Sequence, residues 1–482
     1  MGNDRKVSSI VTGLGWTTLS TIVNGLAQLL RLSILARFLS KEDFGVVAIL
    51  TLVLGLTQVF SDLGFSASVM SQKDLDRKSF LSLYWLQFIV FNAMMVAISL
   101  CSPLIAGYYS EPSLTVLIPV MMSELFFISL GRLYDTLLQK NMQFDVIAMR
   151  NIVAAVLSLV AALGLALAGA GIYSLVLSTV LQAVFVNVWN LIAGQRQYRL
   201  SFHRIDFRQA GELMKVGFYQ MGAQIIDYLA TKLDVLVISS FLGLGALGIY
   251  NLSKELVLKF VVVVNGIANK VMLPVLAQKQ DDLAALRHTF KSFINKLSVV
   301  NAPIVGFTIV FSLTMVRVFY GDAYAEASVT VKVMAVWSLF VVLGQPNGLL
   351  AIATKKTNVS FFYTMLRLAI MGVMLLAFAR HSLMAAAVTM LATYFVMFFV
   401  NWYMLLKKTV GLGLVEYMSQ FAQSWLGTGC VVGLVLVVDR FLPAMSLLAR
   451  DVTNAAIYTV LTGIYLLAFE RRNIMNTFNR RF

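Results

Sequence analysis

Five polar side chains near the start of the chain are spaced so that they share one face of a predicted helix. Successive members are four, three, four and three residues apart, and they are Thr17, Thr21, Asn24, Gln28 and Arg31. The planar guanidinium of Arg31 suits phosphate, because it can donate to two oxygens at once. The amides of Asn24 and Gln28 both donate and accept hydrogen bonds. This first stripe therefore has the chemistry to hold a polar, anionic ligand.

A second stripe lies 203 residues further along the chain, with one member for each member of the first. Its members are Gln220, Gln224, Asp227, Thr231 and Asp234. Asp227 and Asp234 are candidates for exchanging a proton or Na⁺, and Gln224 is a candidate ligand contact. Polar groups that face lipid lose their hydrogen bonds, so both stripes must face protein or water. The matching register predicts two helices that face one central cavity.

The two stripes also have a structural interpretation. Thr, Asn and Gln side chains hydrogen-bond neighbouring helices in many membrane bundles. Arg31 lies past the middle of its predicted span, from where a long cationic side chain can extend to the membrane interface. Asp234 occupies the position that corresponds to Arg31. The sequence leaves open whether these two residues pair or whether Arg31 is free to hold a phosphate.

Three charged residues fall inside the predicted span 113–138. Arg132 and Asp135 are three residues apart, a spacing that predicts an ion pair on one helix face. Glu124 has no partner at helical spacing except the more distant Arg132. It is therefore a candidate for a carboxylate that titrates and exchanges a proton or an ion, since burial without a partner raises the pKa of an acid.

Two lysines lie inside the predicted span 245–275. Lys259 can pair with Glu255 one helical turn earlier, while Lys254 precedes Glu255 directly. A cation without a matching acid at its depth favours an anionic ligand. Lys254 and Lys259 are therefore candidate ligand contacts.

These charges stand in a chain that is otherwise strongly apolar. Its 482 residues are 59% hydrophobic and 13% charged, about half the charged share of soluble proteins. About fourteen segments are apolar and long enough to cross a hydrocarbon core. Runs such as VVAILTLVLGLTQVF do not alternate as the strands of a β-barrel would. The composition predicts an all-α, polytopic membrane protein with about 14 transmembrane helices.

An internal repeat organises these helices. The segments ARFLSKEDFGVVAIL, from Ala36, and SSFLGLGALGIYNLS, from Ser239, resemble each other at the same offset as the stripes. Six predicted spans separate the two copies, so both halves cross the membrane in the same sense, as a parallel repeat does. We expect two six-helix lobes at 1–205 and 206–409, followed by two further helices and a tail at 410–482.

The formal net charge of +15 is mainly a topology signal. Cytoplasmic loops of membrane proteins carry an excess of Lys and Arg. In this chain the excess lies in the loops on the same side as the N-terminus, which predicts that both termini are cytoplasmic. The sequence has no basic stripe with interleaved aromatic residues, so it does not predict nucleic-acid binding. Cys101, Cys430 and the three scattered histidines form no metal or disulfide pattern. The loops are too short for a catalytic domain and contain no P-loop, so we expect neither an enzyme nor a cofactor.

Three segments resemble a known family: ARFLSKEDFGVVAIL, FSDLGFSASVMSQ and FLGLGALGIYNLSKEL. They are similar to the polysaccharide-transporter branch of the multidrug, oligosaccharidyl-lipid and polysaccharide flippase superfamily, which includes the lipopolysaccharide and exopolysaccharide exporters of O-antigen and colanic-acid type. The resemblance implies a flippase that moves a polyprenyl-diphosphate-linked oligosaccharide across the bacterial inner membrane by ion-coupled alternating access. It implies membrane lipids as partners, and the polysaccharide polymerase and export machinery as candidate partners.

The resemblance also implies where the cavity charges lie. Related flippases carry basic residues on helices 1, 2 and 8, and the matches here are Arg31 on the first span and Lys254 or Lys259 on the eighth. The second span departs from this pattern, because it offers only the acid Asp62. The phosphate site is therefore expected to be arranged differently in this chain.

Two alternative functions remain compatible with the sequence. A multidrug or cation antiporter of the same superfamily would suit an acid-rich cavity, which the deep lysines argue against. A membrane-embedded polysaccharide polymerase or glycosyltransferase would place catalytic groups in sizeable external loops, whereas the predicted outer loops are short.

Overall fold

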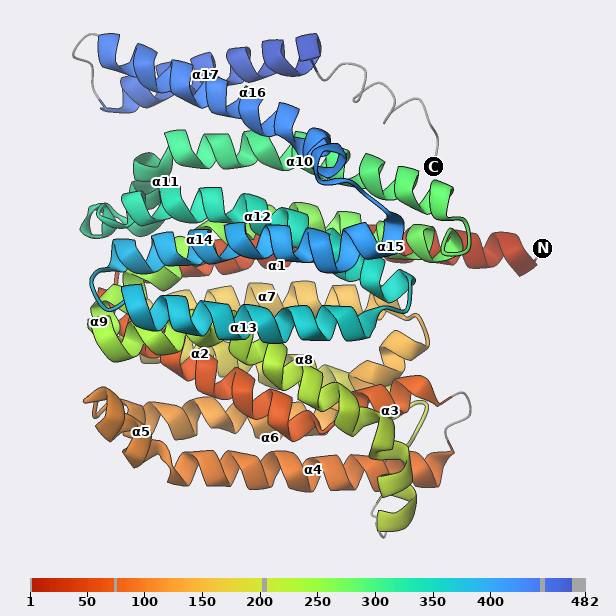
Figure 1. Ribbon diagram of the computed structural model, residues 1–482. Helices are drawn as coiled ribbons and strands as arrows, with labels where there is room; N and C mark the ends of the chain where they lie inside the picture. Colours follow the sequence, from red (N-terminus) through yellow and green to blue (C-terminus); the bar gives the residue numbers. More distant parts are fainter. Residues whose placement is uncertain (1, 73–75, 202–205, 443–446, 470–482) are drawn as a thin grey trace. The chain divides into compact units, whose positions relative to one another are not determined.

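The computed structural model describes residues 2–72, 76–201, 206–442 and 447–469 (Figure 1). Every regular element in this part of the chain is a helix. The predicted tail beyond residue 469 and the side chain of Gln220 lie outside the described residues. The chain divides into two compact units, Met1–Gly248 and Ile249–Phe482. The predicted lobe boundaries after residues 205 and 409 stay predictions.

The first unit is built from long helices joined by short turns. Within it α1 packs against α7, α6 packs against α8, and α7 packs against α8. Its helices are α1 (Gly2–Leu35), α2 (Lys41–Asp62), α3 (Phe65–Ser71), α4 (Arg77–Leu100), α5 (Ser102–Tyr109), α6 (Leu114–Lys140), α7 (Phe144–Leu167), α8 (Tyr173–Gly194) and the first part of α9 (Phe207–Gln278).

The second unit begins inside α9 and is also helical throughout its described part. Here α10 packs against α12 and α16, and α12 packs against α14. Its further elements are α10 (Leu283–Val310), α11 (Ser312–Tyr320), η1 (Asp322–Tyr324), α12 (Ala327–Ala353), α13 (Thr357–Phe378), α14 (Leu383–Asn401), η2 (Trp402–Lys407), α15 (Lys408–Val410), α16 (Leu414–Phe441) and α17 (Leu447–Phe469).

Thirteen segments among the described residues are helical, long and apolar enough to cross a membrane. One of them, Met221–Val261, spans 41 residues, about twice the length that a bilayer requires. It contains two helices that meet at Gly243, whose φ of 79° and ψ of 177° are not helical and suit a residue without a Cβ. Counted as two, this segment completes the fourteen predicted spans. The all-α, multi-pass class predicted from composition is confirmed.

Aromatic residues fix the end of α8 against α4 and α6 in the first unit. Phe80 of α4 stacks on Tyr198 with ring centroids 4.8 Å apart. The hydroxyl of Tyr134 on α6 donates to the backbone carbonyl of Tyr198 at 2.9 Å. Phe80 and Tyr134 are fully buried, so their contacts also exclude water from this core. The core therefore holds α6 and α8, which line the site described below, in a defined arrangement.

The two repeated sequence segments contact each other inside the first unit. A Cβ on Gly45 of α2 would meet the backbone of Leu244 in α9, and a Cβ on Gly248 would meet the backbone carbonyl of Lys41. Lys41 corresponds to Leu244 in the repeat, and Gly45 corresponds to Gly248. Each segment therefore presents the same glycine to the same position of the other, as at a two-fold axis. Glycine recurs here because two helix backbones touch.

The helix that carries Gly45 starts with a capping box. The hydroxyl of Ser40 accepts from the amide of Asp43 at 3.1 Å, and the Asp43 carboxylate accepts from the Ser40 amide at 2.9 Å. We expect Ser40→Ala to lower the free energy of unfolding by about 1 kcal/mol, seen as a lower thermal midpoint in detergent. Ser113 precedes α6 without a side-chain cap, so Ser113→Ala is the matched control. Equal midpoints for the two variants would contradict the capping role.

Candidate functional site

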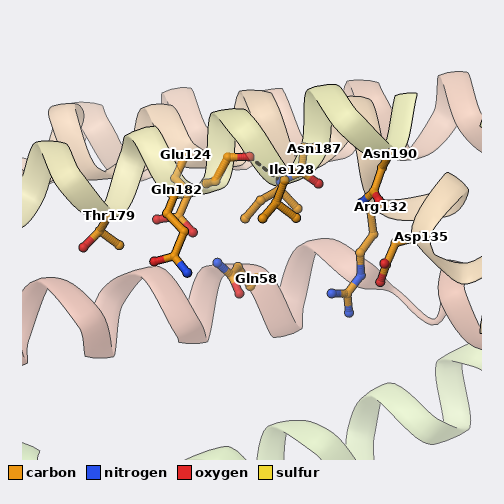
Figure 2. A pocket seen from close by; sticks show the side chains of 11 residues that line it. Gln58, Glu124, Ile128, Arg132, Asp135, Thr179, Gln182, Asn187 and Asn190 are labelled. Atoms are coloured by element: carbon orange, nitrogen blue, oxygen red, sulfur yellow. Dashed lines mark hydrogen bonds between the residues drawn. The ribbon is translucent and has the colours of Figure 1, made fainter. Parts of the chain in front are cut away.

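A cavity of about 270 Å³ lies among α2, α6 and α8 of the first unit (Figure 2). All three helices are candidate membrane spans, yet most of the side chains that line the cavity are polar. Polar and ionisable groups inside a membrane are costly and commonly mark a substrate or ion pathway. The polar lining residues are Gln58, Glu124, Arg132, Asp135, Thr179, Gln182, Asn187 and Asn190.

Arg31 of α1 reaches the edge of this cavity. Its Nη1 donates to Ser158 Oγ on α7 at 2.9 Å and to Thr179 Oγ1 on α8 at 3.5 Å. Its Nε is buried without a hydrogen-bond partner, and Glu124 is its charged electrostatic neighbour. In the described part of the chain Arg31 makes no ion pair with Asp234. The described contacts of Arg31 are thus to residues of α7 and α8, and its role in holding a phosphate stays a prediction.

Glu124 of α6 lies at the cavity wall and is 9% exposed. Its Oε2 is buried and has no hydrogen-bond partner. A buried charged oxygen without a partner is destabilising, and the ion-coupling role of Glu124 stays a prediction. The electrostatic interaction with Arg31 supplies the opposing positive charge. Glu124 and Arg31, which the sequence singled out on separate helices, are thus brought together.

Arg132 of α6 approaches α2 and α3 from the same cavity wall. Its Nε is 3.8 Å from Asp62 Oδ1 and donates to Ser66 Oγ at 3.2 Å. The Ser66 hydroxyl in turn donates to Asp62 at 2.8 Å. The predicted pair between Arg132 and Asp135 is wrong, because Asp135 is bound by an arginine of another helix.

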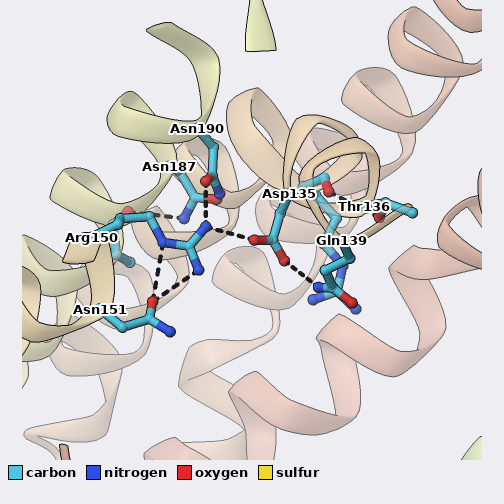
Figure 3. A network of polar contacts seen from close by, with 9 residues as sticks. Asp135, Thr136, Gln139, Arg150, Asn151, Asn187 and Asn190 are labelled. Atoms are coloured by element: carbon cyan, nitrogen blue, oxygen red, sulfur yellow. Dashed lines mark hydrogen bonds and ion pairs between the residues drawn. The ribbon is translucent and has the colours of Figure 1, made fainter. Parts of the chain in front are cut away.

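That arginine is Arg150 of α7, which forms the network shown in Figure 3. Its Nη1 lies 2.5 Å from Asp135 Oδ1 and also donates to Asn190 Oδ1. Its Nε and Nη2 both donate to Asn151 Oδ1, at 3.0 and 2.8 Å. Arg150 is only 4% exposed, so this ion pair links α6, α7 and α8 in a largely dry environment. The network fixes the end of the cavity at Asp135 and Asn190.

Two other predicted ligand contacts belong to the first stripe, Asn24 and Gln28. Asn24 is half-buried, and its amide donates to the Ser20 carbonyl at 2.8 Å. Gln28, one turn further, is also half-buried. Neither belongs to the set of described residues that line the cavity. Their role as ligand contacts stays a prediction.

The second stripe lies on the first part of α9. Gln224 and Asp227 are exposed, whereas Asp234 is fully buried and accepts from the Val235 amide at 2.9 Å. Residues at helical spacing share one face of α9, but the surroundings of that face change from exposed at Asp227 to buried at Asp234. The stripe therefore does not have one uniform environment, and the ion-coupling roles of Asp227 and Asp234 stay predictions.

The two predicted lysines belong to the second unit. The ammonium of Lys254 lies over the rings of Tyr250 and Trp337, at 5.9 and 5.7 Å from their centroids. Lys259 pairs with Glu255 at 3.0 Å, so the predicted pair one turn apart is confirmed. Lys254 is therefore held by aromatic faces, and the charge of Lys259 is balanced by a neighbouring acid.

Sequence reasoning missed the polar side chains of α8 that line the cavity. Thr179, Gln182, Asn187 and Asn190 are spaced by three, five and three residues, which keeps them near one helix face. Each residue alone resembles the polar groups that join helices in any membrane bundle. The stripe they form together in TVLQAVFVNVWN was the available signal.

The chain is similar to proteins of surface-polysaccharide synthesis. The family model described as "polysaccharide biosynthesis protein" matches residues 34–329. The teichuronic acid biosynthesis protein TuaB of Bacillus subtilis (strain 168) is 24% identical over 425 residues, which cover 88% of this chain and 87% of that protein. The lipopolysaccharide biosynthesis protein WzxC of Escherichia coli (strain K12) is 25% identical over 362 residues, covering 74% of this chain and 72% of that protein.

Solved structures of transporters share the fold. The lipid II flippase MurJ in its inward closed conformation covers 95% of this chain and 99% of its own, with a TM-score of 0.76 and 13% identity. An inward-facing multidrug resistance transporter of the MATE family covers 80% of this chain and 93% of its own, with a TM-score of 0.58 and 14% identity. At these identities the likeness establishes the fold alone.

Proposed function

We propose a function for this chain from the premise that it belongs to the polysaccharide biosynthesis protein family. The chain is a secondary transporter that moves a polyprenyl-diphosphate-linked oligosaccharide across the bacterial inner membrane, for the synthesis of a lipopolysaccharide or exopolysaccharide. It works by alternating access and is driven by an ion gradient. Its termini lie in the cytoplasm, as the distribution of Lys and Arg predicts.

The names of the relatives support the class of cargo. They are named for teichuronic acid, lipopolysaccharide and, in the succinoglycan biosynthesis transport protein ExoT of Rhizobium meliloti (strain 1021), succinoglycan transport. ExoT is 26% identical over 250 residues, or 51% of this chain and 49% of that protein. What these names have in common is the biosynthesis of a polysaccharide, and one of them adds its transport. The lipid II flippase has the same fold and is named for a lipid that it moves.

The observation that supports the proposal is the electrostatic interaction of Arg31 with Glu124, an acid that lines a polar cavity within candidate membrane-spanning helices. Protonation of Glu124, or its binding of Na⁺, removes the negative charge that faces Arg31. The guanidinium of Arg31 can then attract an anionic cargo. When Glu124 loses the bound ion, its negative charge attracts the guanidinium again and the cargo is released. Ion binding and cargo binding are coupled in this way, because each changes the charge that the other meets.

The remaining predicted residues complete the proposal. Asn24, Gln28 and Gln224 contact the glycan, and Lys254 and Lys259 supply further positive charge for the diphosphate. Asp227 and Asp234 are alternative ion-coupling acids. A drug antiporter is the second candidate, since the MATE transporters have the same fold. The guanidinium of Arg132 in the cavity wall favours an anionic cargo over a cationic drug.

The experiment is a flipping assay in proteoliposomes with a fluorescent polyprenyl-diphosphate oligosaccharide. The wild-type protein is expected to move this lipid faster under a proton or Na⁺ gradient. Glu124→Gln should lose that acceleration, and Arg31→Gln should slow movement about tenfold or more, the factor given by about 1.4 kcal/mol. Glu111→Gln is the matched control, because Glu111 lies outside the spans and caps a turn.

Two results would overturn the proposal. The absence of lipid-linked sugar movement in the wild type under either gradient would remove the assigned cargo. A gradient effect that is unchanged in Glu124→Gln would remove the coupling role of this acid. Export of a cationic dye in place of the lipid-linked sugar would favour the antiporter.

A further inference from the structure

The cavity of the first unit contains a guanidinium whose outer nitrogens are open to a ligand. Arg132 lines the cavity, and its side chain is 46% exposed and points into it (Figure 2). Its described bonds use only Nε, through Ser66 and Asp62. Within the described part of the chain, Nη1 and Nη2 make no hydrogen bond. These two nitrogens form one edge of a planar fork, the geometry that binds two oxygens of a phosphate.

The acids nearest to Arg132 have other partners. Asp135 is bound by Arg150 at 2.5 Å, and Glu124 faces Arg31. Asp62 accepts from Ser66 at 2.8 Å and lies 3.8 Å from Arg132, which is long for a charge-assisted hydrogen bond. Arg132 therefore has one distant acid, Asp62, and that acid is also bound by Ser66.

The remainder of the lining suits a sugar next to that cation. Gln58 and Gln182 are half-buried, line the cavity and make no hydrogen bond with any described residue. A primary amide both donates and accepts, so it can pair with a hydroxyl in either direction. A cavity of about 270 Å³ has the volume of about nine waters. It is therefore large enough for a diphosphate, which has nine non-hydrogen atoms.

We propose that this cavity is the diphosphate subsite of the carrier lipid, with Arg132 as its anion-binding residue. One edge of the guanidinium holds two oxygens of the isoprenyl diphosphate, while Gln58 and Gln182 face the hydroxyls of the first sugar. Asp62 competes with the ligand for Arg132 and so limits its affinity. This subsite rests on the proposed function for the identity of its ligand, and it names a residue that the sequence assigned to a structural ion pair.

The test measures binding to the full-length protein in detergent by calorimetric titration. The probes are a short-chain isoprenyl diphosphate, the corresponding isoprenyl alcohol and inorganic pyrophosphate. The isoprenyl diphosphate is expected to bind and the alcohol is not. Arg132→Gln should weaken binding of the diphosphates about tenfold to a hundredfold, as the loss of a charged hydrogen-bond pair predicts. Arg132→Lys should recover part of it, because it restores the charge without the fork.

Two further variants separate binding from misfolding. Asp62→Asn retains Arg132 and removes its competitor, so it should tighten binding of the diphosphates several-fold, a gain that a damaged fold cannot give. Arg440→Gln, at an exposed arginine of α16, is the matched control and should bind like the wild type. Identical affinities for Arg132→Gln and Arg440→Gln would overturn the subsite. Equal affinities of the wild type for pyrophosphate and the isoprenyl diphosphate would assign a free diphosphate and overturn the carrier assignment.

Failure of this subsite is distinguishable from failure of the proposed function. Diphosphate binding that depends on Arg132, in a protein that moves no lipid-linked sugar, would leave the subsite standing and remove the transport role. If the protein moves lipid-linked sugar but its diphosphate binding is unchanged in Arg132→Gln, the transport role would stand and the subsite would be overturned.

Discussion

Replacing Arg150 by methionine is expected to lower the free energy of unfolding by about 3–5 kcal/mol. The substitution keeps an apolar chain of similar length but removes the guanidinium that binds Asp135 and Asn190 (Figure 3). Asp135 would then keep its charge at a site that is mostly shielded from water, which is the costly half of breaking a buried pair. Denaturant or thermal unfolding of the purified protein in detergent measures the loss.

Two controls make this prediction specific to the ion pair. Arg440→Met removes an exposed arginine and should change the free energy of unfolding by no more than about 0.5 kcal/mol. Arg150→Met combined with Asp135→Asn should recover part of the loss, because no uncompensated charge remains. A single Arg150→Met variant as stable as Arg440→Met would contradict a structural role for the network.

Alanine at Gly248 is expected to lower the free energy of unfolding by about 1–3 kcal/mol. The new Cβ would meet the backbone carbonyl of Lys41, and a backbone cannot move aside as a flexible side chain can. The result opposes the intrinsic preference of helices for alanine over glycine, which is about 1 kcal/mol. The thermal midpoint in detergent should therefore fall, and with it the flipping rate of the proposed transport assay.

Gly164 provides the matched control, since a Cβ there would have nothing within 4 Å. Gly164→Ala should be neutral or slightly stabilising. Gly45→Ala should lower the stability about as much as Gly248→Ala. A Cβ on Gly45 would meet the backbone of Leu244, which is the repeat equivalent of Lys41. The double variant should lose less than the sum of the two, because one separation of the backbones relieves both contacts. Stability in Gly248→Ala equal to that of Gly164→Ala would contradict the close approach.

The helices were predictable because their signals are local to the sequence. A run of apolar residues of sufficient length identifies a span wherever it packs. The 41-residue segment Met221–Val261 is an example, since the sequence repeat already predicted two spans there, and the helix is interrupted at Gly243. Arg31 and Glu124 were also identifiable, because an ionisable residue within an apolar span is conspicuous.

The contacts between helices were not predictable in the same way. Arg132 and Asp135 are at pairing distance along one helix, and helical spacing gives no information about Asp62 or Arg150 on other helices. The partners are set by which faces of α2, α6 and α7 pack together. Intrahelical rules therefore identified the charged residues but assigned one of the pairs incorrectly.

The reciprocal contact of Gly45 and Gly248 has a consequence for the history of the chain. Two copies of one half-length polypeptide make a contact of this symmetry when they associate as a homodimer. Gene duplication and fusion would preserve that contact without a new residue, because each glycine already faces the correct backbone. After fusion the two copies can differ elsewhere, as Asp234 at the position that corresponds to Arg31 illustrates, while a side chain at either glycine would still meet the other backbone.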